Sequence, residues 1–155
     1  MRLDYLVEPV TENDIRNTLC RAVEILNTQM MDSEYFTALD STIEKLPHTE
    51  ETNSLLEKLY QFLTESKDNT VTAETAAGFF GFNRDYFGRY FKSKTGLTFS
   101  EFYKNFTIEY AKLLLESGHF KIHDISNILG FSSPDYFTRV FKKATGKTPS
   151  EFRKV

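Results

Sequence analysis

The residues best suited to chemistry lie in two copies of one pattern near the C-terminus of this 155-residue chain. Residues 85–104 (DYFGRYFKSKTGLTFSEFYK) and 135–154 (DYFTRVFKKATGKTPSEFRK) are identical at thirteen of twenty positions, at a constant offset of 50. In each copy an arginine and a lysine stand opposite a pair of phenylalanines at helical spacing. They are Arg89 and Lys92 in the first copy and Arg139 and Lys142 in the second. Because a guanidinium can bind a guanine edge or a phosphate, the pattern predicts two similar surfaces that bind nucleic acid.

The same helical faces carry further polar positions, namely Arg84, Asp85 and Gly88 in the first copy and Ser133, Asp135 and Thr138 in the second. For both aspartates we favour a structural role, because a carboxylate in the first helical turn gains about 0.3–1 kcal/mol from the helix dipole. Base readers in two copies would usually differ, but readout of cytosine stays the alternative. Gly88 can only allow close backbone approach, at a cost to the helix of about 1 kcal/mol relative to alanine. We therefore expect the first copy to read fewer bases.

The two arginines have an alternative role. Arg89 could form an ion pair with Asp85 one turn earlier, and Arg139 with Asp135, for only a few tenths of a kcal/mol. We favour DNA contact because both arginines lie opposite the phenylalanines that should be buried. Further candidates for phosphate contact, each of which could equally be a solvated side chain, are Lys92, Lys94, Lys104, Lys142, Lys143, Lys147, Arg153 and Lys154.

Around each arginine the sequence predicts a helix, a tight turn and a second helix. Gly81 and Gly130 stand four residues after small residues, and glycine accepts the positive φ that such a turn demands. Thr98 and Thr148 then begin capping boxes. The helix that follows Thr98 would be about 27–30 Å long and would join the two units. It could present their second helices to successive major grooves, which lie about 34 Å apart.

We therefore expect an all-α fold, in which two helix-turn-helix units are bridged by a long helix and preceded by an acidic helical linker region. The predicted helices lie near residues 53–65, 73–80, 84–94, 99–116, 122–129, 134–144 and 149–154. The predicted buried residues are Leu55, Leu59, Phe62, Phe87, Phe91, Leu114, Ile125, Phe131, Phe137 and Phe141.

Charge divides the chain at about residue 70. Residues 1–70 contain 6 Lys/Arg and 14 Asp/Glu, which gives a net charge of −8. Residues 71–155 contain 13 Lys/Arg and 8 Asp/Glu, which gives a net charge of +5. Of the 23 aromatic residues, 18 lie after residue 70, so the larger core belongs there. This asymmetry indicates that only the second half meets a polyanion.

Residues 53–155 resemble the DNA-binding domain of AraC/XylS-type transcription regulators. The most specific stretch comprises Ile125-Ser126, Gly130-Phe131, Asp135-Tyr136-Phe137, Arg139, Phe141-Lys142, Thr145-Gly146 and Pro149-Ser150-Glu151-Phe152-Arg153. The resemblance implies a sequence-specific regulator that inserts two recognition helices into double-stranded DNA. Two positions depart from the family pattern: Ala76-Ala77 stands where leucine or a similar residue usually precedes the alanine, and Thr107 where arginine is frequent. The second departure puts one helix or phosphate contact in doubt.

The first ten residues carry a weaker resemblance. Leu3-Asp4-Tyr5-Leu6-Val7-Glu8-Pro9-Val10, followed by a helix from Asn13, looks like the last strand and helix of a response-regulator receiver, although Glu8 stands where such receivers have lysine. This resemblance implies a regulator of the YesN-like two-component type. An ordinary strand-like start to a linker is the alternative. We assign residues 1–52 to the receiver end with a helical linker, and residues 53–155 to the DNA-binding domain.

The linker region has helical periodicity from residue 11 to the stop at Pro47. Ile15, Leu19, Ala22, Leu26 and Met30 recur at spacings of four, three, four and four. Such a stripe forms either a short coiled-coil seam or one helix packed on another. We predict a homodimer through residues 11–30, with the DNA-binding halves mobile about Pro47. Cys20 should be a small, partly buried residue in this pattern.

The sequence contains no motif typical of an enzyme, a metal site or a cofactor-binding site. The three histidines and the lone cysteine form no metal-binding spacing, and no phosphate-binding loop, dinucleotide fingerprint or nucleophile elbow is present. We expect no catalytic residue, metal or cofactor. No run of about 20 apolar residues and no signal segment occurs, which predicts a cytoplasmic protein without membrane contact. RNA polymerase is a possible further partner. The competing hypothesis is a helical adaptor that contacts RNA polymerase or another regulator without reading bases.

Overall fold

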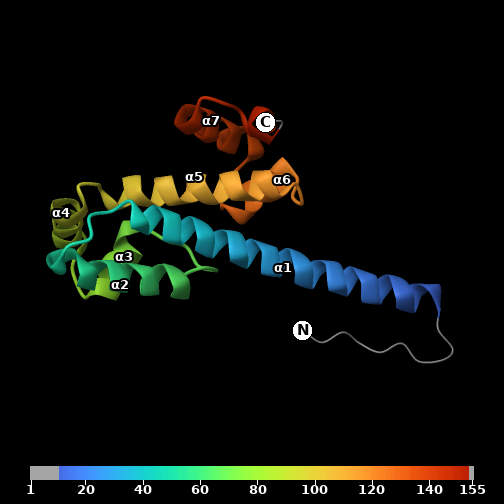
Figure 1. The fold of residues 1–155 in the computed structure, drawn as a ribbon, viewed down its shortest axis with the longest axis horizontal. Coiled ribbons are helices and arrows are strands. Elements are labelled where there is room, and N and C mark those ends of the chain that lie inside the picture. Colours follow the sequence, from blue (N-terminus) through green and yellow to red (C-terminus); the bar gives the residue numbers. More distant parts are fainter. Residues whose placement is uncertain (1–10, 154–155) are drawn as a thin grey trace.

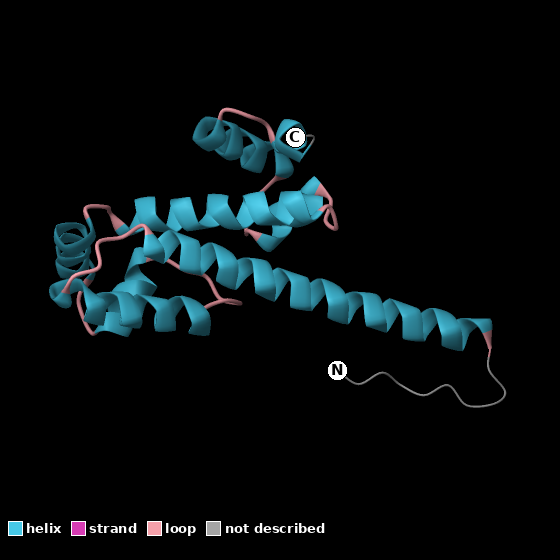
Figure 2. Cartoon of the chain, in the orientation of Figure 1, coloured by secondary structure: helices cyan, strands magenta, loops and turns pink. Residues whose placement is uncertain are grey.

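The computed structural model describes residues 11–153, and these form α-helices joined by short loops, without a strand (Figures 1 and 2). The helices of this part of the chain are α1 (Glu12–Glu44), α2 (Glu50–Glu65), α3 (Ala73–Phe80), α4 (Arg84–Thr95), α5 (Phe99–Ser117), α6 (Ile122–Ile128), α7 (Pro134–Thr145) and α8 (Pro149–Arg153). The all-α expectation is confirmed. The segment that resembles a receiver end, residues 1–10, lies outside the described residues.

The predicted helix bounds agree with the structure because the caps were visible in the sequence. The largest difference is at α2, which begins at Glu50 rather than near 53. Thr49 caps this helix, and the Thr52 hydroxyl is buried and donates to the Pro47 carbonyl at 2.7 Å. The sequence argument took Pro47 as a stop and missed the threonine cap that follows it.

Helix α5 lies at the centre of the core. Its buried residues are Phe99, Phe102, Phe106, Ile108, Tyr110, Ala111, Leu114 and Leu115. Helices α1, α4, α6 and α8 all pack against it, α1 most extensively. In Figure 1, α1 and α7 lie on opposite sides of α5.

The C-terminal half of α1 belongs to the same core. The Tyr35 ring lies 5.1 Å from Phe106 and 5.4 Å from Tyr110, edge to face in both cases. The Tyr35 hydroxyl donates to the Leu63 carbonyl at 2.6 Å, and that of Tyr110 to the Met31 carbonyl at 3.3 Å. The core therefore continues across residue 53, and the helices on both sides of Pro47 are held together. This packing contradicts the predicted mobility about Pro47.

The N-terminal half of α1 has no such packing and projects away from the other helices (Figure 1). Its exposed large apolar residues are Ile15, Leu19, Val23 and Leu26. Cys20 is also exposed, because nothing in the described chain covers this part of the helix, so the prediction of partial burial was wrong. Phe131 was expected in the core but is only half-buried, because it stands in the turn after α6.

Two leucines of α1 test this division. Leu39 is fully buried against the core, whereas Leu26 is 53% exposed. We expect Leu39→Ala to lower the free energy of unfolding by about 2–5 kcal/mol, because it leaves a cavity. The same substitution at Leu26 should change it by less than about 0.5 kcal/mol. Urea unfolding at low protein concentration measures both. Equal effects would show that α1 is no part of the core.

Candidate nucleic-acid interface

The two helix-turn-helix units have the same turn geometry. Gly81 and Gly130 adopt φ of 75° and 80°, where a Cβ would be strained. The amide after each glycine donates to the carbonyl five residues earlier, at 2.9 Å from Phe82 and 3.0 Å from Phe131. Such bonds satisfy carbonyls that the end of the first helix would otherwise leave free. The turns therefore aim α4 and α7 in the same way relative to α3 and α6.

Both recognition helices, α4 and α7, are capped at each end. The Asn83 side chain accepts from the Tyr86 amide at 2.8 Å, and the Ser133 hydroxyl from the Tyr136 amide at 3.1 Å. Gly96 and Gly146 end the helices, each at φ 82°. Ser133, a predicted site residue, thus serves at least to begin α7. The pairs Phe87/Phe91 and Phe137/Phe141 are fully buried, which fixes the opposite faces toward solvent.

The predicted residues of the first unit lie together. Arg84, Asp85, Gly88, Arg89 and Lys92 line one open hollow of about 600 Å³ beside the start of α5. All five are exposed. The Arg84 guanidinium forms an ion pair with Glu74 of α3 at 3.1 Å, so it also links the two helices of the unit. The space around Gly88 is open, so a larger ligand can approach this backbone.

In the second unit, Asp135, Arg139 and Lys142 are exposed on α7, and Thr138 is half-buried. The Arg139 guanidinium lies over the Tyr136 ring, 5.7 Å from its centroid, an arrangement that orients the side chain. Among the described residues neither Arg89 nor Arg139 forms an ion pair with the aspartate of its own helix, so the alternative role is not what the structure shows.

Two of the proposed phosphate contacts have other partners. Arg153 donates to the carbonyls of Leu115, at 3.3 Å, and Phe120, and so satisfies the C-terminal end of α5. Lys94 pairs with Glu51 at 3.3 Å. These partners lie 33 to 43 residues away in sequence, where no spacing rule could reveal them. Lys154 lies outside the described residues.

Two exposed aromatic residues of this surface were not predicted from the sequence. Tyr86 and Tyr136 are each 47% exposed and stand at the same position of α4 and α7. Their identity in both copies is the signal in the sequence that could have identified them. A tyrosine beside an arginine offers an apolar surface that can meet a sugar or a thymine methyl group.

The bridging helix fixes the separation of the two units. Nineteen residues at 1.5 Å each give α5 a length of about 28 Å. The exposed cations of α4 and α7 therefore belong to two units that are joined by a single continuous helix. A fold of this kind defines a double helix-turn-helix protein.

Comparisons with known proteins agree with this class. Residues 76–155, half of the chain, match the family model described as "Helix-turn-helix domain". The C-terminal domain of the response regulator yesN from Fusobacterium nucleatum is similar, with 26% identity and a TM-score of 0.59 over 65% of this chain and 98% of that one. The C-terminal domain of AraT, a response regulator from Geobacillus stearothermophilus, has 27% identity and a TM-score of 0.55, over 63% and 84%.

The DNA-binding domain of AdpA, solved in complex with a target DNA, has 25% identity and a TM-score of 0.58, over 64% of this chain and 89% of that one. No curated protein matches the chain. The chain belongs to the AraC/XylS family of helix-turn-helix proteins, and it is a DNA-binding regulator of transcription.

No helix of residues 11–153 is long and apolar enough to cross a membrane.

One of the buried positions at which the first helices of the two units differ yields a stability test. Ser126 is fully buried, and its hydroxyl has no hydrogen-bond partner among the described residues, whereas Ala77 occupies the equivalent position of the first unit. We expect Ser126→Ala to raise the free energy of unfolding by about 0.5–1.5 kcal/mol, because an unmet buried hydroxyl is costly.

Thr95→Val is the matched control. Its buried hydroxyl donates to the Phe91 carbonyl at 2.8 Å and accepts from the Leu97 amide, so this substitution should be destabilising by about 1–2 kcal/mol. Thermal unfolding measures both variants. Destabilisation by Ser126→Ala would mean that the hydroxyl has a partner in solution.

Proposed function

We propose that α4 and α7 enter successive major grooves on one face of a DNA duplex, and that this chain thereby reads a specific operator. One observation carries the proposal: two units with the same turn and cap geometry are joined by α5, a single helix about 28 Å long, and each unit has an exposed arginine and lysine. The similarity to the AdpA domain, solved with its target DNA, supports it. The net charge of +5 after residue 70 favours the same partner.

In this proposal Arg89 and Arg139 contact base edges, and Lys92 and Lys142 contact phosphates. A guanidinium can bind guanine through two parallel hydrogen bonds, whereas an ammonium is a point charge. Asp85 and Asp135 stabilise the first turn of each helix. Gly88 offers no side chain where the second unit has Thr138. The second unit therefore supplies more of the sequence preference.

We further propose that the chain is the output part of a two-component response regulator. The similarity to the C-terminal domains of yesN and AraT supports this origin, as does the sequence of residues 1–10. In such a protein α1 would join the receiver to the DNA-binding units. We keep the domain boundary at residue 53 as a division of function, although the hydrophobic core extends across it.

The exposed stripe of α1 supports a homodimer through residues 11–30. Ile15, Leu19, Ala22 and Leu26 follow the alternating four- and three-residue spacing of a coiled-coil seam. A helix that gains little tertiary packing is marginally stable in water, so a second copy would stabilise this part of α1. Contact between this chain and RNA polymerase stays a prediction, which rests on the sequence alone.

Substitutions at the second recognition helix test the assignment of the reading face. Arg139→Ala should weaken binding to the specific site by about 1–3 kcal/mol and relax the preference at one base position. Lys142→Ala should weaken binding to all sequences alike and reduce the slope of log affinity against log salt by about one. Fluorescence anisotropy with operator and random duplexes, over a range of salt, measures both quantities. Selection of a binding site from random duplexes supplies the operator.

The same titration separates this function from an adaptor that does not read bases. A regulator loses affinity steeply as salt rises, because binding releases counterions. An adaptor would show no affinity to titrate. If Arg139→Ala changed binding to operator and random duplexes by the same factor, the reading face would be wrongly assigned while DNA binding itself would stand.

A charged pair of substitutions tests the dimer. Leu19→Glu with Leu26→Glu places four like charges in the proposed seam, so sedimentation equilibrium should change from dimer to monomer at tens of micromolar. Neither side chain is buried in the single chain, so the fold should persist. The control is Asn17→Glu with Thr28→Glu, which adds the same charge to the opposite face of α1 and should leave the dimer intact. A monomeric parent chain at that concentration would refute the proposal.

A further inference from the structure

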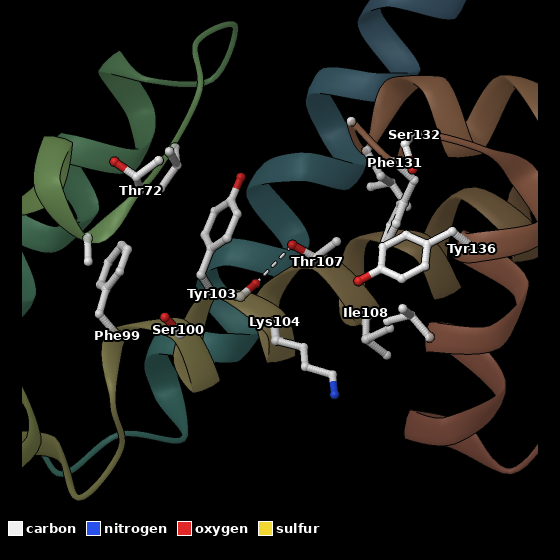
Figure 3. Close-up of a pocket in the computed structure, with 15 residues that line it drawn as sticks. Thr72, Phe99, Ser100, Tyr103, Lys104, Thr107, Ile108, Phe131, Ser132 and Tyr136 are labelled. Atoms are coloured by element: carbon white, nitrogen blue, oxygen red, sulfur yellow. Dashed lines mark hydrogen bonds between the residues drawn. The ribbon is translucent and has the colours of Figure 1, made fainter.

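A second hollow of about 600 Å³ lies between the two helix-turn-helix units (Figure 3). The loop before α3 forms one side, the turn before α7 forms the other, and α5 forms the base. Its volume lies within the range of small-molecule sites, which favour junctions between modules. None of the residues predicted to read bases lines it, but it adjoins the hollow of the first unit, with which it shares Ala73, Phe99 and Ser100.

The residues that line this inter-unit pocket are suited to binding a flat, apolar ligand. Aromatic rings from α5 and from the second unit line it, namely Phe99, Tyr103, Phe131 and Tyr136. Branched side chains such as Ile108 and Val140 complete the lining. Aromatic rings pack well on one another edge to face or offset. The ligand that fits these walls is itself aromatic.

The polar groups of the pocket suit an anion. Lys104 is exposed at the rim, and none of the lining residues is acidic. Within the described chain, neither the Lys104 ammonium nor the Tyr136 hydroxyl has a hydrogen-bond or ion-pair partner. In Figure 3 the Tyr136 hydroxyl points across the pocket toward Thr107. Burial raises the pKa of the Tyr103 phenol, so this group also stays protonated and can donate.

A comparison of the two repeat copies explains why the inter-unit pocket is empty of protein side chains. In the first unit three rings pack together: Tyr90 lies 5.3 Å from Phe82 and is stacked on Tyr86. In the second unit the first two positions are again aromatic, with Phe131 5.7 Å from Tyr136, but Val140 replaces the third ring. The pocket thus opens where the first unit has an aromatic side chain.

We infer that the inter-unit pocket binds a small aromatic carboxylate, whose ring packs between Phe131, Tyr103 and Tyr136 and whose carboxylate accepts from Lys104 and Tyr136. A bound anion between the units adds negative charge beside the recognition helices. Ligand binding therefore weakens DNA binding, a consequence that rests on the proposed function. By linkage, DNA weakens ligand binding by the same factor.

Calorimetric titration of the full chain with naphthoate, and with neutral naphthamide of the same shape, tests the site without DNA. We expect naphthoate to bind with a dissociation constant of about 0.1–1 mM, typical of a ligand of this size. Lys104→Gln should weaken naphthoate about three- to tenfold, because the charge lies at an exposed rim. The same variant should leave naphthamide unchanged, as should Lys147→Gln, a control elsewhere on the surface, for both ligands.

Val140→Tyr tests the space itself, since it introduces the side chain that the first unit already packs at this position. It should abolish binding of both compounds, with unchanged thermal unfolding as the check that the fold is intact. The site would be refuted by the absence of saturable naphthoate binding, or by undiminished binding to Val140→Tyr. Loss of DNA affinity in Lys104→Gln, together with no naphthoate binding, would show that the pocket belongs to the DNA contact instead.

Anisotropy with the operator duplex tests the coupling separately. Saturating naphthoate should lower the affinity of the parent chain for DNA and leave that of Val140→Tyr unchanged. Binding of naphthoate without any effect on DNA affinity would refute the coupling and support the site. A chain that binds naphthoate and no DNA would refute the proposed function and still support the site.

Discussion

The positions of both recognition helices depend on the burial of α5. In proteins, most of the stability of a helix comes from the tertiary packing of its apolar face. Packing by α1, α4, α6 and α8 makes this helix a fixed spacer. Its two ends are held by different means: Thr98 and Glu101 form a capping box at the start, and Arg153 donates to the Leu115 carbonyl near the end. These contacts therefore hold α5 in place between α4 and α7.

The two copies share the residues that fold the unit, together with the outward pairs Arg89/Arg139 and Lys92/Lys142, and differ at other outward positions. Their common residues are the buried phenylalanines, the cap-forming threonine and glutamate, and the glycine that ends each recognition helix. Their differences include Gly88 against Thr138 on the reading face and Tyr90 against Val140 at the inter-unit pocket. The copies are therefore alike in their folding residues and in their exposed cations, and unlike at the two surface positions just named.

Local chemistry explains which parts of the structure could be predicted from the sequence. Helix bounds followed from caps and glycines, whose effects reach only a few residues. The outward position of Arg89 and Arg139 followed from the spacing of the phenylalanines they oppose. Contacts between distant segments carried no such signal: Tyr35 against Phe106, Arg153 against the end of α5, and the hollow beside Val140 all depend on how helices pack. The same reason explains the error at Cys20, since periodicity shows that a face is apolar and not whether anything covers it.

Helix α1 is continuous and connects the acidic N-terminal region to the core of the DNA-binding units. At 33 residues this helix is about 50 Å long, and only its second half is buried. No loop separates the exposed stripe from the Tyr35 contact with α5, so a partner that binds residues 12–29 acts on the same rigid element that supports the spacer. A flexible linker at Pro47 would have isolated the DNA-binding units from such a partner. The two halves of α1 belong to one helix, and its second half belongs to the same core as α5. A partner bound to the N-terminal half is therefore connected directly to the helix that joins the recognition helices.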